Sequence, residues 1–220
     1  AGGCDGVPRG HPVLLIACDA SASLSNDQMR MTKVMAASWL TATSKSGVCV
    51  LAGLYHSGEV RQGVSGPLIQ WIAHPCKSVA ASKRDAIRAL VALPDKGTGA
   101  QSDALSIAFM LEEAKRLARG SMIYLILISD CAWNQSFNTE KNGKEKVRAF
   151  FESAHDDLNG KLNTTLVALG VSEETGFEDL LEKVVKVSEE NLRDYAAVAE
   201  QIGVYVASCI RERRRPMGRR

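Results

Sequence analysis

Apolar runs of strand length alternate with helical patterns along the chain. The runs cover residues 12–18, 47–56, 122–130 and 164–171. Apolar residues recur at helical spacing in residues 27–44, 82–93 and 102–118, in the segment that ends near 159, and in a closing helix at 191–212. Asn26 is the expected cap of the first helix. This alternation predicts an open, mostly parallel sheet with helices on both faces.

Three shorter segments have weaker patterns. Residues 59–64 follow the turn signal at 57–58 and are expected to return as a short antiparallel strand. Residues 66–81 contain two prolines and are interpreted as a short helix followed by a loop. Residues 176–184 are interpreted as a short helix, and residues 184–187 as a last, edge strand.

Composition is that of a globular protein. The 220 residues are enough for one domain with a sizeable core, and no apolar run approaches the roughly 18 residues of a membrane span. The six cysteines are widely spaced, with no CxxC pair, which favours reduced thiols and a cytoplasmic location. No charged start followed by an apolar stretch indicates a secretory signal.

Charge is distributed unevenly. The last ten residues hold six arginines and one glutamate, whereas the first 210 hold 21 basic and 24 acidic residues. We therefore expect an N-terminal extension at 1–11, one domain at 12–210, and a basic tail at 211–220. The tail, Arg211 to Arg220, is expected to be a solvated terminus; binding of nucleic acid through it is the alternative.

Candidate chemistry lies at the ends of two predicted central strands. The first strand runs into Asp19, Ser21 and Ser23, and the run at 122–130 ends at Asp130. In open sheets of this kind, ligands bind beyond the carboxyl ends of the strands. The loop before the helix at 102–118 adds Thr98 or Ser102. Taken alone, Asp19 and the serines that follow it could instead cap a turn and a helix.

Two carboxylates and several hydroxyls form a set of hard oxygen ligands. Such a set suits Mg²⁺, or Mn²⁺, better than Zn²⁺. Because the hydroxyls are neutral, the ion would keep Lewis acidity and an open position that a carboxylate from outside could fill.

The chain resembles the von Willebrand factor A domains. The resemblance is carried by D-x-S-x-S after the first strand, a Gly-Thr loop before a helix, and S-D after a central strand. It implies a Rossmann-like three-layer sandwich with one short antiparallel edge strand. It also implies a metal-ion-dependent adhesion site in which Asp19, Ser21, Ser23, Thr98 and Asp130 surround the ion, some of them through water. The chain departs from the family at Cys131, where glycine is frequent.

The resemblance implies a non-catalytic, protein-binding module. A partner would supply an Asp or Glu to the metal, and relatives inside cells often serve as adaptors in multi-subunit machines that include AAA+ ATPases. The alternative is a Mg²⁺-dependent phosphohydrolase-like enzyme. Phosphatases of the haloacid-dehalogenase type need a second Asp two residues after the nucleophile, and Ser21 occupies that position.

Overall fold

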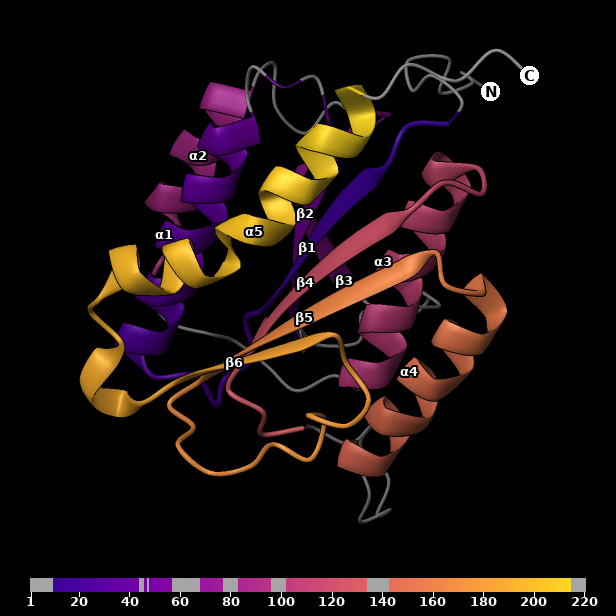
Figure 1. Ribbon diagram of the computed structural model, residues 1–220. Helices are drawn as coiled ribbons and strands as arrows, with labels where there is room; N and C mark the ends of the chain where they lie inside the picture. The colour runs from indigo at the N-terminus through magenta and orange to yellow at the C-terminus, as the bar shows by residue number, and fades with distance from the viewer. Residues whose placement is uncertain are drawn as a thin grey trace.

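A six-stranded sheet forms the centre of the molecule (Figure 1). The computed structural model describes residues 10–43, 46, 48–56, 68–76, 83–95, 102–133 and 143–214. The strand order is β3-β2-β1-β4-β5-β6, in which β3 is antiparallel to β2 and all other neighbours are parallel. The strands are β1 (Val13–Asp19), β2 (Cys49–His56), β3 (Leu68–Ala73), β4 (Ile123–Ser129), β5 (Leu162–Leu169) and β6 (Lys183–Val187).

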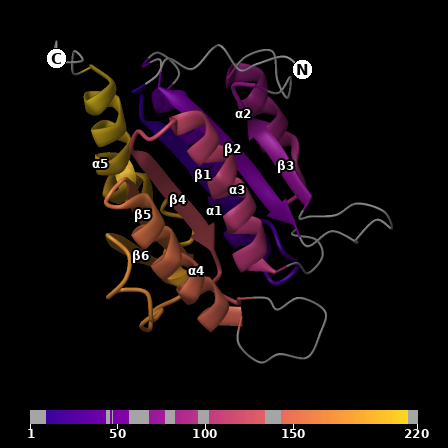
Figure 2. The ribbon, with the colours of Figure 1, turned by 90° about the vertical axis from the view of Figure 1, so that its right-hand side faces the viewer.

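Helices cover both faces of the sheet (Figure 2). One face carries α1 (Asn26–Thr43), α2 (Lys83–Ala92) and α5 (Tyr195–Arg214), and the other carries α3 (Asp103–Ala118) and α4 (Gly143–Leu158). A short 3-10 helix (Glu189–Asn191) precedes α5. The predicted α/β class is therefore confirmed: the chain is a Rossmann-like three-layer sandwich with one antiparallel edge strand.

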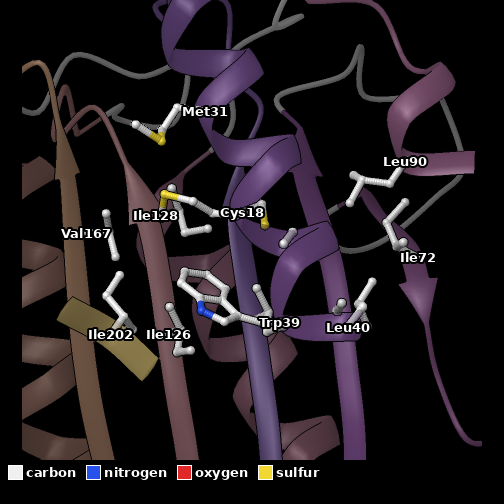
Figure 3. Close-up of a cluster of buried hydrophobic side chains, with 14 of the residues drawn as sticks. Cys18, Met31, Trp39, Leu40, Ile72, Leu90, Ile126, Ile128, Val167 and Ile202 are labelled. Atoms are coloured by element: carbon white, nitrogen blue, oxygen red, sulfur yellow. The ribbon is translucent and has the colours of Figure 1, made fainter. Parts of the chain in front are cut away.

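Burial on both faces explains why β1 and β4 were clear in the sequence. Every residue of both strands is buried. Successive side chains point to opposite faces, so two separate apolar clusters form, one under each helical layer. Trp39 of α1 lies in the first cluster with Ile126 of β4 and Ile202 of α5 (Figure 3). Continuous apolar runs are what a strand covered on both faces requires.

Two predictions of local structure were wrong. The segment 66–81 contains β3 and not a short helix, because its apolar residues pair with β2 at the sheet edge. Residues 176–182 form turns and not a helix. There the Glu178 carboxylate accepts hydrogen bonds from the backbone N–H groups of Thr175 and Gly176, both at 2.8 Å. The strand predicted at 59–64 lies outside the described residues.

The start of α1 is fixed by a reciprocal cap. The Gln28 N–H donates to Ser25 Oγ at 3.2 Å, and the Ser25 N–H donates to Gln28 Oε1 at 2.7 Å. The cap is thus Ser25, and the prediction of Asn26 was one residue late. Gln28 Nε2 also donates to the carbonyl oxygen of Leu169, at 3.0 Å. One side chain therefore joins the first turn of α1 to the end of β5.

The cysteines are not uniformly reduced. Cys18, Cys49, Cys131 and Cys209 are free, but Cys76 is disulfide-bonded. The expectation of reduced thiols is therefore wrong at Cys76. No spacing motif marks this cysteine in the sequence.

Among the described residues, none of the helices has both the length and the apolar character needed to cross a bilayer.

Candidate metal-binding site

Three polar side chains lie in a row across adjacent strands at the carboxyl edge of the sheet. Asp19 ends β1 and is in register with Tyr55 of β2. On the other side of β1, the hydroxyl of Ser129, the last residue of β4, donates to Asp19 Oδ2 at 2.9 Å. All three residues are buried. Parallel pairing thus brings residues 36 and 110 positions away from Asp19 against it.

Asp19 is a buried carboxylate held by neutral donors. Its Oδ1 accepts the backbone N–H of Ser21 at 2.8 Å, while Oδ2 accepts the Ser129 hydroxyl. Burial, and next the negative charge of Asp130, raise the pKa of Asp19 from 3.8 to about 6. Among the described residues, no basic side chain forms an ion pair with Asp19 or Asp130. The two acids therefore form a negative centre that lacks a protein counter-ion in this part of the chain.

Ser21 and Ser23 lie beside each other, as the alternation in D-x-S-x-S predicts. Their Oγ atoms are 3.0 Å apart, within hydrogen-bond distance. Ser21 is buried and Ser23 is exposed. The pair thus extends from the buried Asp19 towards solvent and offers two neutral oxygen ligands.

Asp130 follows β4 in a tight turn. Its Oδ1 accepts the N–H of Ala132 at 3.0 Å, and the N–H of Cys131 donates to Ser129 Oγ at 3.1 Å. Cys131 has a φ of 59°, in the left-handed region that glycine adopts most easily. This conformation gives a physical reason for the frequent glycine at this position in the family that the chain resembles. Burial and then Asp130 raise the pKa of the Cys131 thiol, which keeps it protonated.

The loop before α3 is only partly described. Thr98, the preferred loop ligand, lies outside the described residues. Ser102 is the N-cap of α3, where its Oγ accepts the N–H of Leu105 at 3.4 Å. This hydrogen bond uses one of the two lone pairs of the hydroxyl oxygen, so Ser102 stays an alternative to Thr98. Asp103, the first residue of α3, is buried.

Sequence reasoning did not single out Tyr55 and Ser129, which flank Asp19 in the row, or Asp103, whose negative charge acts on Tyr55. Tyr55 lies near the end of a predicted strand, and Ser129 precedes Asp130, so both positions were visible in the sequence. Their role depends on strand register, which short apolar runs do not specify. Asp103 could have been noticed as an acid in the first turn of a strong helix.

The arrangement is chemically limited to a two-carboxylate site. In the part of the chain that the structure describes, no group of three or more His, Cys, Asp or Glu side chains could hold a metal ion. Two acids and neutral hydroxyls fit a hard divalent cation that keeps waters among its ligands.

Comparison by sequence gives no relatives. No protein-family model matches the chain. No curated protein matches it either.

Solved structures share the fold. Two solved structures of proximal thread matrix protein 1 from the mussel byssus are similar, with TM-scores of 0.61 and 0.57 at 11% and 13% identity. The match covers 91% of this chain and 49% or 47% of that protein. The pilus adhesin SpaC from Lactobacillus rhamnosus GG, in its open conformation, matches with a TM-score of 0.62 at 12% identity, over 92% of this chain and 30% of the adhesin. The chain thus spans about half or less of each neighbour, and the likeness is one of fold.

Proposed function

We propose that the protein is a binding module of the von Willebrand factor A type that engages a partner protein through a Mg²⁺ or Mn²⁺ ion. Asp19, Ser21, Ser23 and Asp130 would hold the ion, together with Thr98 from the loop before α3. One observation carries the proposal: the buried carboxylate of Asp19 lies next to the half-buried Asp130 and to two hydroxyls, and the described residues provide no basic partner for either acid. Burial of an uncompensated carboxylate is costly, and a cation removes that cost.

The mixture of charged and neutral oxygens favours binding of an external acid. Two carboxylates balance the charge of a divalent ion, and hydroxyl ligands add none. The ion, acting as a Lewis acid, would therefore still attract a carboxylate, and an Asp or Glu of a partner supplies one. No catalytic step is needed for this function, and we propose a non-enzymatic role.

Metal binding can be tested with the isolated chain. Calorimetric titration with Mg²⁺ and with Mn²⁺ should give one site in the wild-type protein and none in Asp19→Ala. Asp156→Ala, which changes an exposed acid on α4, is the matched control and should bind like wild type. Equal binding by wild type and Asp19→Ala would exclude this site.

The open position can be tested separately. Bound Mn²⁺ that keeps an exchanging water enhances the relaxation of solvent protons. Addition of a short peptide that contains one Glu should lower this enhancement, whereas the same peptide with Gln should not. If neither peptide, or both alike, changes the relaxation, the ion does not select a carboxylate and the proposed mode of partner binding is wrong.

The class of partner and the cellular location rest on different observations. An AAA+ ATPase partner follows from the family resemblance alone. The disulfide at Cys76 favours an oxidising compartment over the predicted cytoplasmic location, because disulfides persist mainly in oxidising compartments. Mass spectrometry after alkylation, with and without reductant, should detect a thiol at Cys76 only in the reduced sample.

A further inference from the structure

Tyr55 is the one member of the row across β2, β1 and β4 whose polar atom forms no hydrogen bond of normal geometry. Its side chain is 2% exposed, and its hydroxyl has no hydrogen bond of normal geometry within the described part of the chain, although the Ser129 hydroxyl lies close enough to act on its pKa. An unpaired buried hydroxyl costs about 1–3 kcal/mol. Since buried polar groups are nearly always paired, the exception calls for a reason, such as an ion or a water that the group serves.

The Tyr55 hydroxyl lies next to the acids of the candidate metal site. Strand register places Tyr55 beside Asp19 on the sheet face that α3 covers, and the N–H of Ala20 donates to the Tyr55 carbonyl oxygen at 3.1 Å. Burial, followed by the negative charges of Asp19 and Asp103, raises the pKa of Tyr55 well above its usual value. The phenol therefore stays neutral and keeps its proton. It faces acids from two different elements, β1 and α3.

Asp103 is a second buried polar group whose charge acts on Tyr55. It is 2% exposed and opens α3, the helix that follows the Thr98 loop. A cation held by two carboxylates and hydroxyls keeps water ligands, and a bound water has hydrogens to donate. A carboxylate and a phenol oxygen are both able to accept them.

We infer that Tyr55 and Asp103 are positioning residues of the candidate site, which together hold a water ligand of the bound cation on its buried side. The inference rests on the proposed function, since it needs a metal at Asp19. It extends the site from the residues of the D-x-S-x-S pattern to β2 and to the first turn of α3. The partner carboxylate would then approach from the opposite, exposed side, where Ser23 lies.

The test separates metal affinity from stability. Tyr55→Phe removes only the hydroxyl oxygen, and in excess chelator its unfolding midpoint should equal or exceed that of wild type, because an unpaired polar atom is lost. Its dissociation constant for Mg²⁺ should nevertheless rise about tenfold, the usual effect of removing a group that orients metal ligands. A merely structural role for Tyr55 would not weaken metal binding while leaving stability intact.

Two further variants sharpen the result. Tyr124→Phe changes a buried tyrosine of β4 on the opposite face of the sheet, and should bind Mg²⁺ like wild type. Asp103→Asn should weaken Mg²⁺ about as much as Tyr55→Phe, and the double variant should be little worse than either, because both act on one water. Wild-type affinity in Tyr55→Phe would overturn the inference and leave the metal site standing. Absence of Mg²⁺ and Mn²⁺ binding in the wild type would instead remove the proposed function first.

Discussion

Replacement of Asp19 by asparagine should stabilise the metal-free protein. In the folded state, burial and the charge of Asp130 raise the pKa of Asp19 from 3.8 to about 6. Two units of pKa correspond to about 3 kcal/mol, by which ionised Asp19 destabilises the fold above pH 6. Asparagine removes the charge and keeps an acceptor for the Ser21 N–H. The Ser129 hydroxyl, which donates to Asp19, then meets the amide N–H₂ group and must rotate to accept from it. This change of partner costs about 1 kcal/mol.

The net gain is therefore about 2 kcal/mol, or about 4–8 °C in melting temperature for a chain of this size. The sign with pH follows from the raised pKa. The penalty is present when Asp19 is ionised, shrinks as the pH falls through 6, and vanishes below 3.8, where the folded and unfolded states are both protonated. The advantage of Asp19→Asn, about 2 kcal/mol near pH 7.5, should thus shrink as the pH falls and reverse by about pH 4, where the amide cost of about 1 kcal/mol outweighs what remains of the charge penalty.

Urea unfolding in excess chelator measures this difference directly. Asp156→Asn on the exposed surface of α4 is the control for loss of one negative charge, and should leave stability within about 0.5 kcal/mol of wild type. Addition of Mg²⁺ should reverse the order, because it stabilises only the wild type. If Asp19→Asn is less stable than wild type in chelator at neutral pH, the idea of an uncompensated buried acid is wrong.

Three other changes test the fold itself. Gly53→Ala places a Cβ 3.0 Å from Met110 Cε and 3.2 Å from Trp71 Cε3. It should lower the free energy of unfolding by about 1–3 kcal/mol in urea titrations. Wild-type stability would show that these side chains move aside without cost. Ser25→Ala removes the α1 cap and should cost about 1 kcal/mol, with faster amide exchange confined to the first turn of α1 if the cap acts locally. Arg116, and then the hydrogen bond from His74, lower the pKa of Glu113 from 4.5 to about 2, so its contribution is present above pH 4.5 and is lost as the pH falls towards 2. Because Glu113 is partly exposed, Glu113→Gln should cost about 1 kcal/mol at pH 7 and nothing at pH 2; an equal cost at both would refute the ion-pair account.

The sequence was most informative where burial acts on both faces of an element. The strands ending at Asp19 and Asp130 are continuous apolar runs, and the acids that end them therefore stood out. The edge strand β3 was missed because prolines flank it on both sides. Its pairing with β2 depends on tertiary structure, which the local pattern does not contain. The segment from 176 was taken for a helix on its apolar spacing. In the structure, Phe177 is fully buried and Glu178 bonds to the preceding N–H groups, so local turn chemistry prevails over helical periodicity.

The candidate site shows the same division. Residues that belong to a local pattern, Asp19, Ser21 and Ser23, could be proposed from their spacing alone. Tyr55 and Ser129 become neighbours of Asp19 only through parallel register, and one residue of slip would turn them to the other face. Pattern analysis identifies which elements end in polar groups. It does not determine which of those groups touch.

The double use of Gln28 limits how the ligand loop can move. Its oxygen closes the cap of α1 and its nitrogen holds the end of β5, while Asp19 is anchored at the other end by Ser129. Between these two anchors the Ala20 N–H is also held by the Tyr55 carbonyl oxygen, so the part of the ligand loop that can adjust when an ion or a partner binds is residues 21–24. A movement of this stretch that keeps the Gln28 hydrogen bonds intact therefore moves the start of α1 and the end of β5 together.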